Sequence, residues 1–180
     1  MKLLKDILYK VDLDLIHGDT NVAIPHLCFD SRQVQKDSLF IAVKGSLSNG
    51  HDYIEKSVES GALAVVCEKL PLNISDNVVY VLVKDSSKAL GVISANFYDN
   101  PSEKIKLVGV TGTNGKTTVA TLLHSLFQAL GYNAGLVSTV VYKIGSRSID
   151  ATHTTPDAIR LNAMLREMID GGCKYCFMEV

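Results

Sequence analysis

The stretch from residue 105 to residue 130 constrains the fold most, because it joins a strand, a glycine-rich loop and a helix in one order. The apolar residues of 105–110 predict a buried strand. The run Gly-Val-Thr-Gly-Thr-Asn-Gly-Lys-Thr-Thr covers 109–118, and apolar residues then recur at helical spacing from Val119 to Leu130. A strand that leads into a glycine loop and then a helix is the setting of a phosphate-binding loop, so the sequence predicts one here.

The residues of this loop have the chemistry that a polyphosphate requires. Glycine lets the backbone wrap closely around the phosphates, while free N–H groups and the dipole of the following helix attract their negative charge. Lys116 would reach the β- and γ-phosphate oxygens, and the Thr117 hydroxyl would bind Mg²⁺. The common motif has a glycine five positions before Gly115, where this chain has Val110. The glycines fall instead at three-residue steps, which indicates a particular subclass; the alternative is a plain turn between strand and helix.

The rest of the chain also alternates strands and helices, and it divides at a polar segment. Helices are expected at 2–10, 53–61, 85–98 and 157–170, and strands at 28–30, 39–43, 62–67, 78–83, 134–141 and 173–180. We therefore predict an α/β fold with a small amino-terminal α/β domain at 1–85. A truncated parallel-sheet domain with the phosphate loop follows at 86–180, and the change of domain lies between 84 and 104.

The composition restricts the classes of function. The 180 residues are 47% hydrophobic and 21% charged with a formal net charge of −1, so the chain can bury a core and lacks the basic excess of a general nucleic-acid binder. No apolar run approaches 18 residues, and the mixed-charge start does not continue into a signal-peptide core. A cytoplasmic protein without membrane insertion is expected. Its apolar last residues, 176–180, resemble an interrupted strand, which suggests a fragment of a longer protein.

Four cysteines occur, and Cys173 and Cys176 form a C-x-x-C pair. A metal clip or a redox pair is one interpretation. The pair, however, lies in a strand-like segment where residues three apart point to opposite faces, and no second pair completes a tetrahedral zinc site. We therefore expect Cys28, Cys67 and this pair to be buried free thiols.

Several segments together make the sequence similar to a known family. The loop at 109–118, with its glycines at three-residue steps, resembles the ATP loop of the Mur ligases, which are cytoplasmic enzymes of peptidoglycan precursor synthesis. The segments that resemble the Mur ligase adding the third peptide residue are Phe-Asp-Ser-Arg-Gln-Val at 29–34, Leu-Phe-Ile-Ala-Val-Lys-Gly at 39–45, Asn-Gly-His-Asp-Tyr-Ile at 49–54, Thr-Thr-Pro-Asp at 154–157 and Met-Glu-Val at 178–180. The matches lie in both expected domains.

The resemblance implies an ATP-dependent amide ligase with ATP and Mg²⁺ as cofactors. Its substrates would be UDP-N-acetylmuramoyl-L-alanyl-D-glutamate and an amino acid, diaminopimelate or lysine, joined through an acyl phosphate. A chain that ends at Val180 would lack the rest of such an enzyme and is expected to be inactive alone. Two alternatives stay open: a related ligase, such as another Mur ligase or a folylpolyglutamate ligase, and a non-catalytic nucleotide-binding module.

The resemblance also implies roles for residues of the second domain. The ATP-binding residues would be Thr111, Gly112, Thr113, Asn114, Gly115, Lys116, Thr117 and Thr118. Lys116 would be the catalytic residue that neutralises charge on the γ-phosphate, while Thr117 and Glu179 would hold Mg²⁺. From the sequence alone, Glu179 could equally be a solvated acid at the end of a strand.

The substrate contacts that the resemblance implies lie in two parts of the chain. Ser31 and Ser46 match positions that contact the uridine part, and hydroxyls can bind uracil or ribose without adding charge. Thr154 and Thr155 match the pair that binds the substrate diphosphate at a helix start. Taken singly, each serine could be a turn residue and Thr155 a helix cap.

The histidines have no evident common role. His153 stands where some relatives have asparagine, so its contact with the substrate is left open. No pair of histidines has a helical metal-ligand spacing. We expect the other four, His17, His26, His51 and His124, at the surface or in packing.

Overall fold

The computed structural model describes residues 1–45, 48–145, 147–150 and 156–180. Contacts divide the chain into two compact units, Met1–Phe97 and Tyr98–Val180. The division falls inside 84–104, where the sequence indicates a change of domain. Helix α3 (Ser86–Phe97) stays with the first unit because it packs against α1 (Leu4–Ile7) of that unit. Within the described ranges, no helix is long and apolar enough to cross a bilayer.

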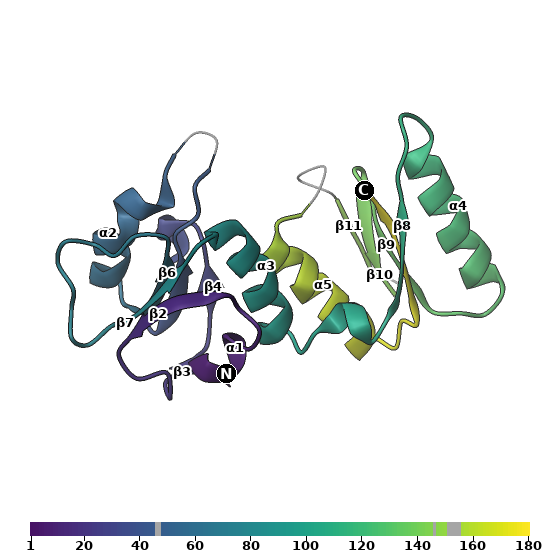
Figure 1. The fold of residues 1–180 in the computed structure, drawn as a ribbon. Coiled ribbons are helices and arrows are strands. Elements are labelled where there is room, and N and C mark those ends of the chain that lie inside the picture. The colour runs from purple at the N-terminus through teal and green to yellow at the C-terminus, as the bar shows by residue number, and fades with distance from the viewer. Residues whose placement is uncertain (46–47, 146, 151–155) are drawn as a thin grey trace. The chain divides into compact units, whose positions relative to one another are not determined.

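The first unit is built on a five-stranded sheet (Figure 1). Its strands, in spatial order, are β2 (Leu13–His17), β7 (Val79–Val83), β6 (Ala62–Cys67), β5 (Ser38–Ile41) and β4 (Leu27–Cys28). The strands from β4 to β7 are parallel, and β2 is antiparallel to β7. The remaining elements are the antiparallel pair β1 (Lys2–Leu3) and β3 (Ala23–Ile24), the 3-10 turns η1 (Ser31–Gln33) and η2 (Gly50–Tyr53), and α2 (Ile54–Glu59).

The central strands of this sheet are buried on both faces. Phe40, Val65 and Tyr80 pack in one cluster with Ile54 of α2. Residues that alternate with them, such as Val66, are fully buried too, since successive side chains of a strand point to opposite faces. Figure 1 shows α2 on one side of the sheet and α3 on the other. This two-sided burial explains the nearly continuous apolar runs of β6 and β7.

The second unit contains another five-stranded sheet. Its strands, in spatial order, are β11 (Arg147–Asp150), β10 (Val141–Ile144), β9 (Ala134–Val137), β12 (Tyr175–Glu179) and β8 (Lys106–Val110). The three strands β9, β12 and β8 run parallel. The helical elements are the 3-10 turn η3 (Pro101–Glu103) before β8, α4 (Lys116–Ala129) between β8 and β9, and α5 (Ala158–Asp170) before β12.

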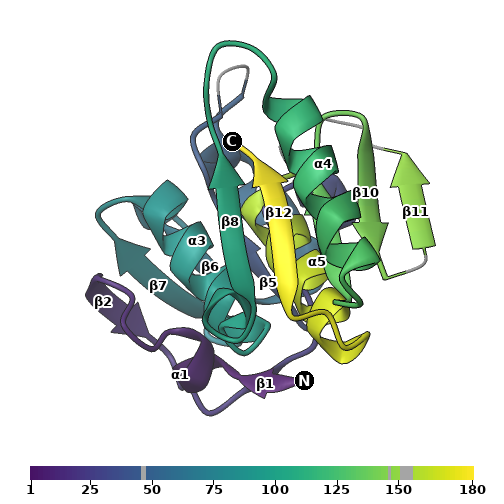
Figure 2. The same cartoon turned by 90° about the vertical axis from the view of Figure 1, so that its right-hand side faces the viewer.

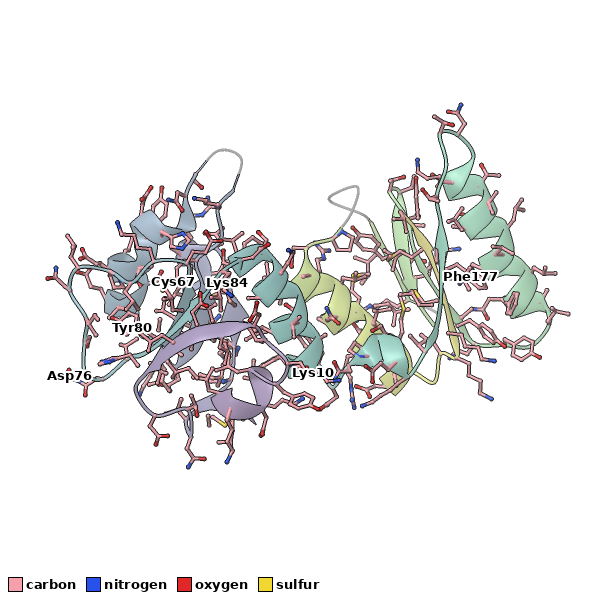
Figure 3. The ribbon with its side chains drawn as sticks, in the orientation of Figure 1. Lys10, Cys67, Asp76, Tyr80, Lys84 and Phe177 are labelled. Carbon is pink, nitrogen blue, oxygen red and sulfur yellow. The ribbon has the colours of Figure 1, made fainter. Side chains whose placement is uncertain are left out.

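Helices α4 and α5 cover opposite faces of this second sheet. Phe177 of β12 packs in one cluster with Ala120 of α4, whereas its neighbour Cys176 packs in another with Met168 of α5. Figure 2 shows β8 and β12 side by side, with α4 in front of the sheet and α5 behind it. Figure 3 shows Phe177 between the sheet and α4. Adjacent residues of one strand thus anchor two helices.

The second sheet corrects two expectations. Residues 134–141 do not form one strand, because β9 ends at Val137 and β10 begins at Val141. The Ser138 hydroxyl donates to the Val141 carbonyl at 2.9 Å and accepts from the Val141 amide at 3.1 Å, which closes a tight turn. The chain reverses there, so β10 and β11 add an antiparallel hairpin. The sheet is therefore mixed rather than purely parallel.

The amino-terminal segment also differs from the expected helix over 2–10. Lys2 and Leu3 pair with β3, and Lys10 adopts a left-handed backbone with φ 60°, which leaves only the short α1. Strand β2 is absent from the sequence-based prediction. It lies at the edge of its sheet and most of its residues are exposed.

The four cysteines are buried free thiols, as predicted. Burial raises the pKa of Cys28 and Cys67 to about 11 and the pKa of Cys176 to about 12, so all three strongly favour the neutral thiol. Cys173 and Cys176 lie in one core cluster rather than on opposite faces, because Cys173 precedes β12 instead of belonging to it.

Candidate functional site

The glycine-rich loop joins β8 to α4 through two residues with left-handed backbone angles. Gly112 has φ 149°, and Gly115, the last residue before α4, has φ 79°. Residues other than glycine rarely adopt either angle. A Cβ at Gly115 would meet nothing within 4 Å, so the backbone angle rather than space requires glycine there. Residues 111–115 are all exposed. The loop therefore turns sharply into the helix while its backbone stays accessible.

The first turn of α4 is suited to an anion. Within the described residues, no side chain caps the helix at Gly115, and its first turn contains no acidic residue, so the positive end of the helix dipole is uncovered. The Lys116 ammonium group donates to the Gly112 carbonyl at 2.9 Å and lies across the loop. A phosphate group at this loop would meet both the helix end and the lysine.

Glu179 lies next to the loop because β12 and β8 are parallel neighbours, with Glu179 opposite Val110. Its Oε2 accepts hydrogen bonds from the Thr117 hydroxyl at 2.9 Å, the Thr139 hydroxyl at 3.1 Å and the Thr139 amide at 3.2 Å. Thr139 belongs to the turn that Ser138 closes directly after β9. The carboxyl ends of three parallel strands and the start of α4 thus converge on one carboxylate.

This carboxylate is held in its charged form, although the residue as a whole is only 9% exposed. Burial by itself raises the pKa of Glu179, but the hydrogen bonds from Thr117 and Thr139, helped by the charge of Lys116, outweigh burial and lower the pKa below its ordinary value. The result is an ionised carboxylate beside two hydroxyl groups, which are hard oxygen ligands.

These oxygens fit a magnesium ion. A carboxylate and a hydroxyl group are oxygen ligands of the kind that Mg²⁺ prefers, and here Thr117 Oγ1 and Glu179 Oε2 lie next to each other. The described part of the chain contains no group of three or more His, Cys, Asp or Glu side chains that could hold a metal ion. A cation here would need further ligands, as Mg²⁺ commonly takes from substrate phosphates and water.

The first unit has a pocket of about 490 Å³ lined by the turn after β4 and the loop after β5. Phe29 and Ser31 come from the first segment, and Gly50 and Tyr53 from the second. The two aromatic residues are 37% and 40% exposed, so both rings are available for stacking. The other lining residues are Asp30, Arg32, Phe40, Val43, Gly45, Ser48 and Lys56. Such a pocket can take a planar ring that also makes hydrogen bonds at its edge.

Asp30 and Arg32 hold the first of these segments in shape. Arg32 Nη2 lies 2.6 Å from Asp30 Oδ2, and Arg32 Nε lies 2.9 Å from Asp30 Oδ1. The same Oδ1 accepts from the Arg32 amide at 3.0 Å and so caps η1. These hydrogen bonds from Arg32 hold the pKa of Asp30 below its usual range. The capped turn presents Ser31 at the pocket.

Two family models match the chain over the segments that form these sites. The one described as "Mur ligase family, catalytic domain" matches residues 23–98, and the one described as "Mur ligase middle domain" matches residues 110–180. The first match includes the pocket-lining residues, and the second includes Lys116, Thr139 and Glu179. The chain belongs to the Mur ligase family.

Curated relatives of this Mur ligase chain carry a more specific name. The chain is 54% identical over 178 residues to the UDP-N-acetylmuramoyl-L-alanyl-D-glutamate--2,6-diaminopimelate ligase of Cytophaga hutchinsonii, covering 98% of this chain and 37% of that protein. It is 49% identical over 177 residues to the ligase of the same name from Bacteroides fragilis, covering 98% and 36%. The chain thus spans little more than a third of the length of these relatives.

Solved structures share the fold. A structure of a UDP-N-acetylmuramoyl-L-alanyl-D-glutamate--2,6-diaminopimelate ligase matches with a TM-score of 0.77 at 22% identity, over 99% of this chain and 36% of that one. MurF ligase from Thermotoga maritima in complex with ADP matches with a TM-score of 0.57 at 24% identity, over 86% and 31%. The predicted α/β class is confirmed.

The residues that the sequence points to fall into four groups. Lys116, Thr117 and Glu179 lie together at the carboxyl edge of the second sheet, and Ser31 lines the pocket of the first unit. The remaining loop residues, Thr111, Gly112, Thr113, Asn114, Gly115 and Thr118, are exposed before or in the first turn of α4. Four residues, Ser46, His153, Thr154 and Thr155, lie outside the described part of the chain.

Sequence reasoning does not identify Thr139, Phe29 or Tyr53. The signal for Thr139 is the Ser138-Thr139 pair directly after an apolar strand, because serine and threonine often close turns there. Phe29 and Tyr53 stand in two of the segments that carry the family resemblance, but aromatic residues in such segments are equally common in cores.

Proposed function

We propose that the full protein is an ATP-dependent amide ligase of peptidoglycan precursor synthesis, located in the cytoplasm. Its substrates would be UDP-N-acetylmuramoyl-L-alanyl-D-glutamate and 2,6-diaminopimelate, the compounds in the names of the relatives. The observation that carries the proposal is the ionised Glu179 carboxylate, hydrogen-bonded to Thr117 beside the uncapped start of α4 in the described chain. This arrangement supports the transfer of a phosphoryl group from ATP.

Amide formation requires an activated carboxyl group. The substrate carboxylate would attack the γ-phosphorus of ATP, ADP would leave, and the amine of the amino acid would then displace phosphate from the acyl phosphate. Lys116 would release the Gly112 carbonyl and hold γ-phosphate oxygens, while the loop amides bind the rest of the polyphosphate. Positioning and charge stabilisation supply most of the catalysis in such transfers.

Glu179 and Thr117 would be protein ligands of Mg²⁺, which when bound neutralises phosphate charge. Thr139 would act on Glu179. Its amide and hydroxyl groups keep the carboxylate oriented and ionised, as outer hydrogen-bond partners do for many metal ligands.

The pocket of the first unit would bind the uridine part of the UDP substrate. Phe29 and Tyr53 would stack on the uracil ring, and Ser31, with Ser46, would make hydrogen bonds to uracil or ribose. The family resemblance assigns the diphosphate to Thr154 and Thr155. None of these contacts needs a charged side chain, in contrast to the ATP site.

The test is ADP release by the full-length protein with ATP, Mg²⁺, the UDP-dipeptide and diaminopimelate. Release is expected only when all are present, and the product should be the UDP-tripeptide by mass spectrometry. Release of ADP with L-lysine instead of diaminopimelate would support the ligase activity and show that the amino-acid substrate is lysine. A folded protein that binds nucleotide but forms no peptide product and has no affinity for the UDP-dipeptide would favour a non-catalytic module instead.

A further inference from the structure

His51 lies in η2, and both of its ring nitrogens are hydrogen-bonded. The Glu68 amide lies 2.8 Å from Nε2, and Asn49 Oδ1 lies 2.9 Å from Nδ1. A backbone amide can only donate, so Nε2 must carry a lone pair. The ring is therefore neutral, with its proton on Nδ1, and that N–H donates to Asn49.

The orientation of Asn49 is fixed in the same way. Its Oδ1 lies 3.2 Å from the backbone amide of His51, which can only donate, so this atom is the carbonyl oxygen and not the amide nitrogen. It can accept from Nδ1 of the ring as well. Two backbone amides, at Glu68 and at His51 itself, thus impose one tautomer on the imidazole.

The Glu68 end of this chain of hydrogen bonds is anchored in the centre of the unit. Glu68 directly follows β6, and its Oε1 accepts from the Ser86 amide at 3.0 Å and the Ser86 hydroxyl at 2.9 Å at the start of α3. The hydrogen bonds from Ser86 lower the pKa of Glu68 and keep it charged. The Glu68 backbone is therefore a firm point of attachment for His51.

The Asn49 end is attached to the pocket loop. Asn49 and Lys44 form an isolated antiparallel β-bridge. The Gly50 amide donates to the Val43 carbonyl at 2.9 Å. A Cβ at Gly50 would come within 2.7 Å of Val43 backbone atoms, so the two segments are as close as glycine allows. Val43, Gly50 and Tyr53 all line the 490 Å³ pocket, whereas the His51 side chain lines a different one. His51 itself thus lies outside the 490 Å³ pocket, and its hydrogen bonds connect the pocket-lining segment around Gly50 to Glu68 at the end of β6.

We propose that neutral His51 is the positioning residue for this side of the uridine pocket, and that its protonation weakens binding of the UDP substrate. The inference rests on the proposed function of the pocket. A proton on Nε2 occupies the lone pair that accepts the hydrogen bond from the Glu68 amide. This hydrogen bond then breaks, and the amide loses its partner. The loop and η2 then lose this attachment to the residue that follows β6.

Charged groups of both signs surround the ring. Asp52 in η2, Glu55 in α2 and Lys69 after β6 line the pocket that His51 shares, and the Glu68 carboxylate interacts with His51 and with Lys44. The three carboxylates of Asp52, Glu55 and Glu68 are thus accompanied by the two lysines Lys44 and Lys69. Protonation of the ring costs the hydrogen bond from the Glu68 amide.

Titration calorimetry of the full-length protein with UDP-N-acetylmuramoyl-L-alanyl-D-glutamate at pH 8.0 and pH 5.5 tests this inference, because the ligand keeps its charge over that range. The wild-type Kd should rise roughly threefold to tenfold at pH 5.5. In His51→Gln the side-chain oxygen can accept from the Glu68 amide without titrating, so its Kd should stay within about twofold at both pH values. His26→Gln, which changes an exposed histidine of the same unit, should keep the wild-type dependence.

A wild-type Kd that does not change with pH, or a His51→Gln variant that keeps the full dependence, overturns the inference while the proposed function stands. Absence of binding at pH 8.0 overturns the proposed function and this inference with it. Nitrogen-15 NMR of the ring is an independent check, since the structure requires the Nδ1–H tautomer at pH 8.0 and an Nε2–H tautomer contradicts it. His51→Leu, which has no acceptor, should bind more weakly than His51→Gln at both pH values.

Discussion

The phosphate loop of the second unit and the pocket of the first differ in what supplies their binding groups. In the loop, the exposed backbone and the uncapped start of α4 would supply the binding groups, and the left-handed angles at Gly112 and Gly115 shape this segment. In the pocket, side chains from two separate segments supply the surface, and hydrogen bonds at Asp30 and His51 hold those segments. The loop therefore depends on local backbone angles, whereas the pocket depends on attachments that single side chains can lose.

Glu179 makes the site of the second unit dependent on side-chain hydrogen bonds, as the pocket of the first unit is. It lies 62 residues after Thr117 in the sequence and reaches the loop only through the pairing of β12 with β8. Its three hydrogen bonds to Thr117 and Thr139 are side-chain attachments of the kind that hold the pocket. The proposed ATP site thus combines a local backbone loop with one carboxylate that only the sheet supplies.

The largest expected effect is that of Lys116→Ala in the full-length protein. Loss of the ammonium group removes charge stabilisation from the γ-phosphate, so kcat for ligation should fall at least about 10²- to 10³-fold. The Kd for the UDP substrate, measured by calorimetry, should change little, because the pocket proposed for its uridine part lies in the other unit. Lys104→Ala, which changes an exposed lysine of the same unit, is the control. Ligation near the wild-type rate would contradict the role of Lys116.

The next effects are on the magnesium requirement. Glu179→Gln keeps the size of the side chain but removes the charged ligand, so the Mg²⁺ concentration for half-maximal rate should rise roughly 100-fold. Initial rates of ADP release over a magnesium series give this value. An unchanged magnesium requirement would exclude Glu179 as a ligand.

Thr139→Val should have a smaller effect on the same measurement. The substitution removes the hydroxyl that donates to Glu179 but keeps the backbone amide that donates to the same oxygen. The magnesium requirement should therefore rise by only about tenfold, at the low end for an outer hydrogen-bond partner. An effect as large as that of Glu179→Gln would make Thr139 a direct ligand instead.

Asp30→Ala tests whether the pocket of the first unit depends on a single side-chain attachment. It removes both the cap of η1 and the partner of Arg32, so the turn that presents Ser31 loosens. The Kd for the UDP substrate should rise roughly threefold to fivefold, while the affinity for ATP stays the same. Asp76→Ala, in an exposed loop of the same unit, should leave both affinities unchanged. A loss of ATP affinity would show that the two sites do not depend on separate attachments.

The smallest effect concerns stability below neutral pH. His124 of α4 is buried in the second unit. Burial, with the charge of Lys143, outweighs a backbone hydrogen bond with Ala134 and lowers the pKa of His124. The unfolded chain then binds this proton at a higher pH than the folded chain, so stability is lost as pH falls through the ordinary histidine range near 6.5.

His124→Leu should remove this part of the pH dependence. The urea midpoint of the second unit, followed by hydrogen exchange in α4, should fall less between pH 7.5 and pH 5.5 in the variant than in the wild type. The variant His17→Gln, in an exposed strand, serves as the control. Equal losses of stability in wild type and His124→Leu would exclude His124 as the source.

The order of helices and strands was largely predictable because it follows local patterns. The strand at 62–67 and the helices at 86–97 and 116–129 lie where apolar periodicity, caps and glycines indicate. The hairpin after β9 was not predictable in this way. Residues 134–141 were predicted as one strand, and the Ser138 hydrogen bonds reveal that the chain reverses within this segment.

The sequence by itself determined the phosphate loop and the family, because left-handed glycines, an uncapped helix start and short motifs are properties of neighbouring residues. Only the tertiary structure decided that Thr139 orients Glu179 and that His51 joins the pocket loop to Glu68. Each of these contacts joins segments that lie apart in the chain. Their partners are set by strand register and by the closure of turns, and neither is a property of any single segment.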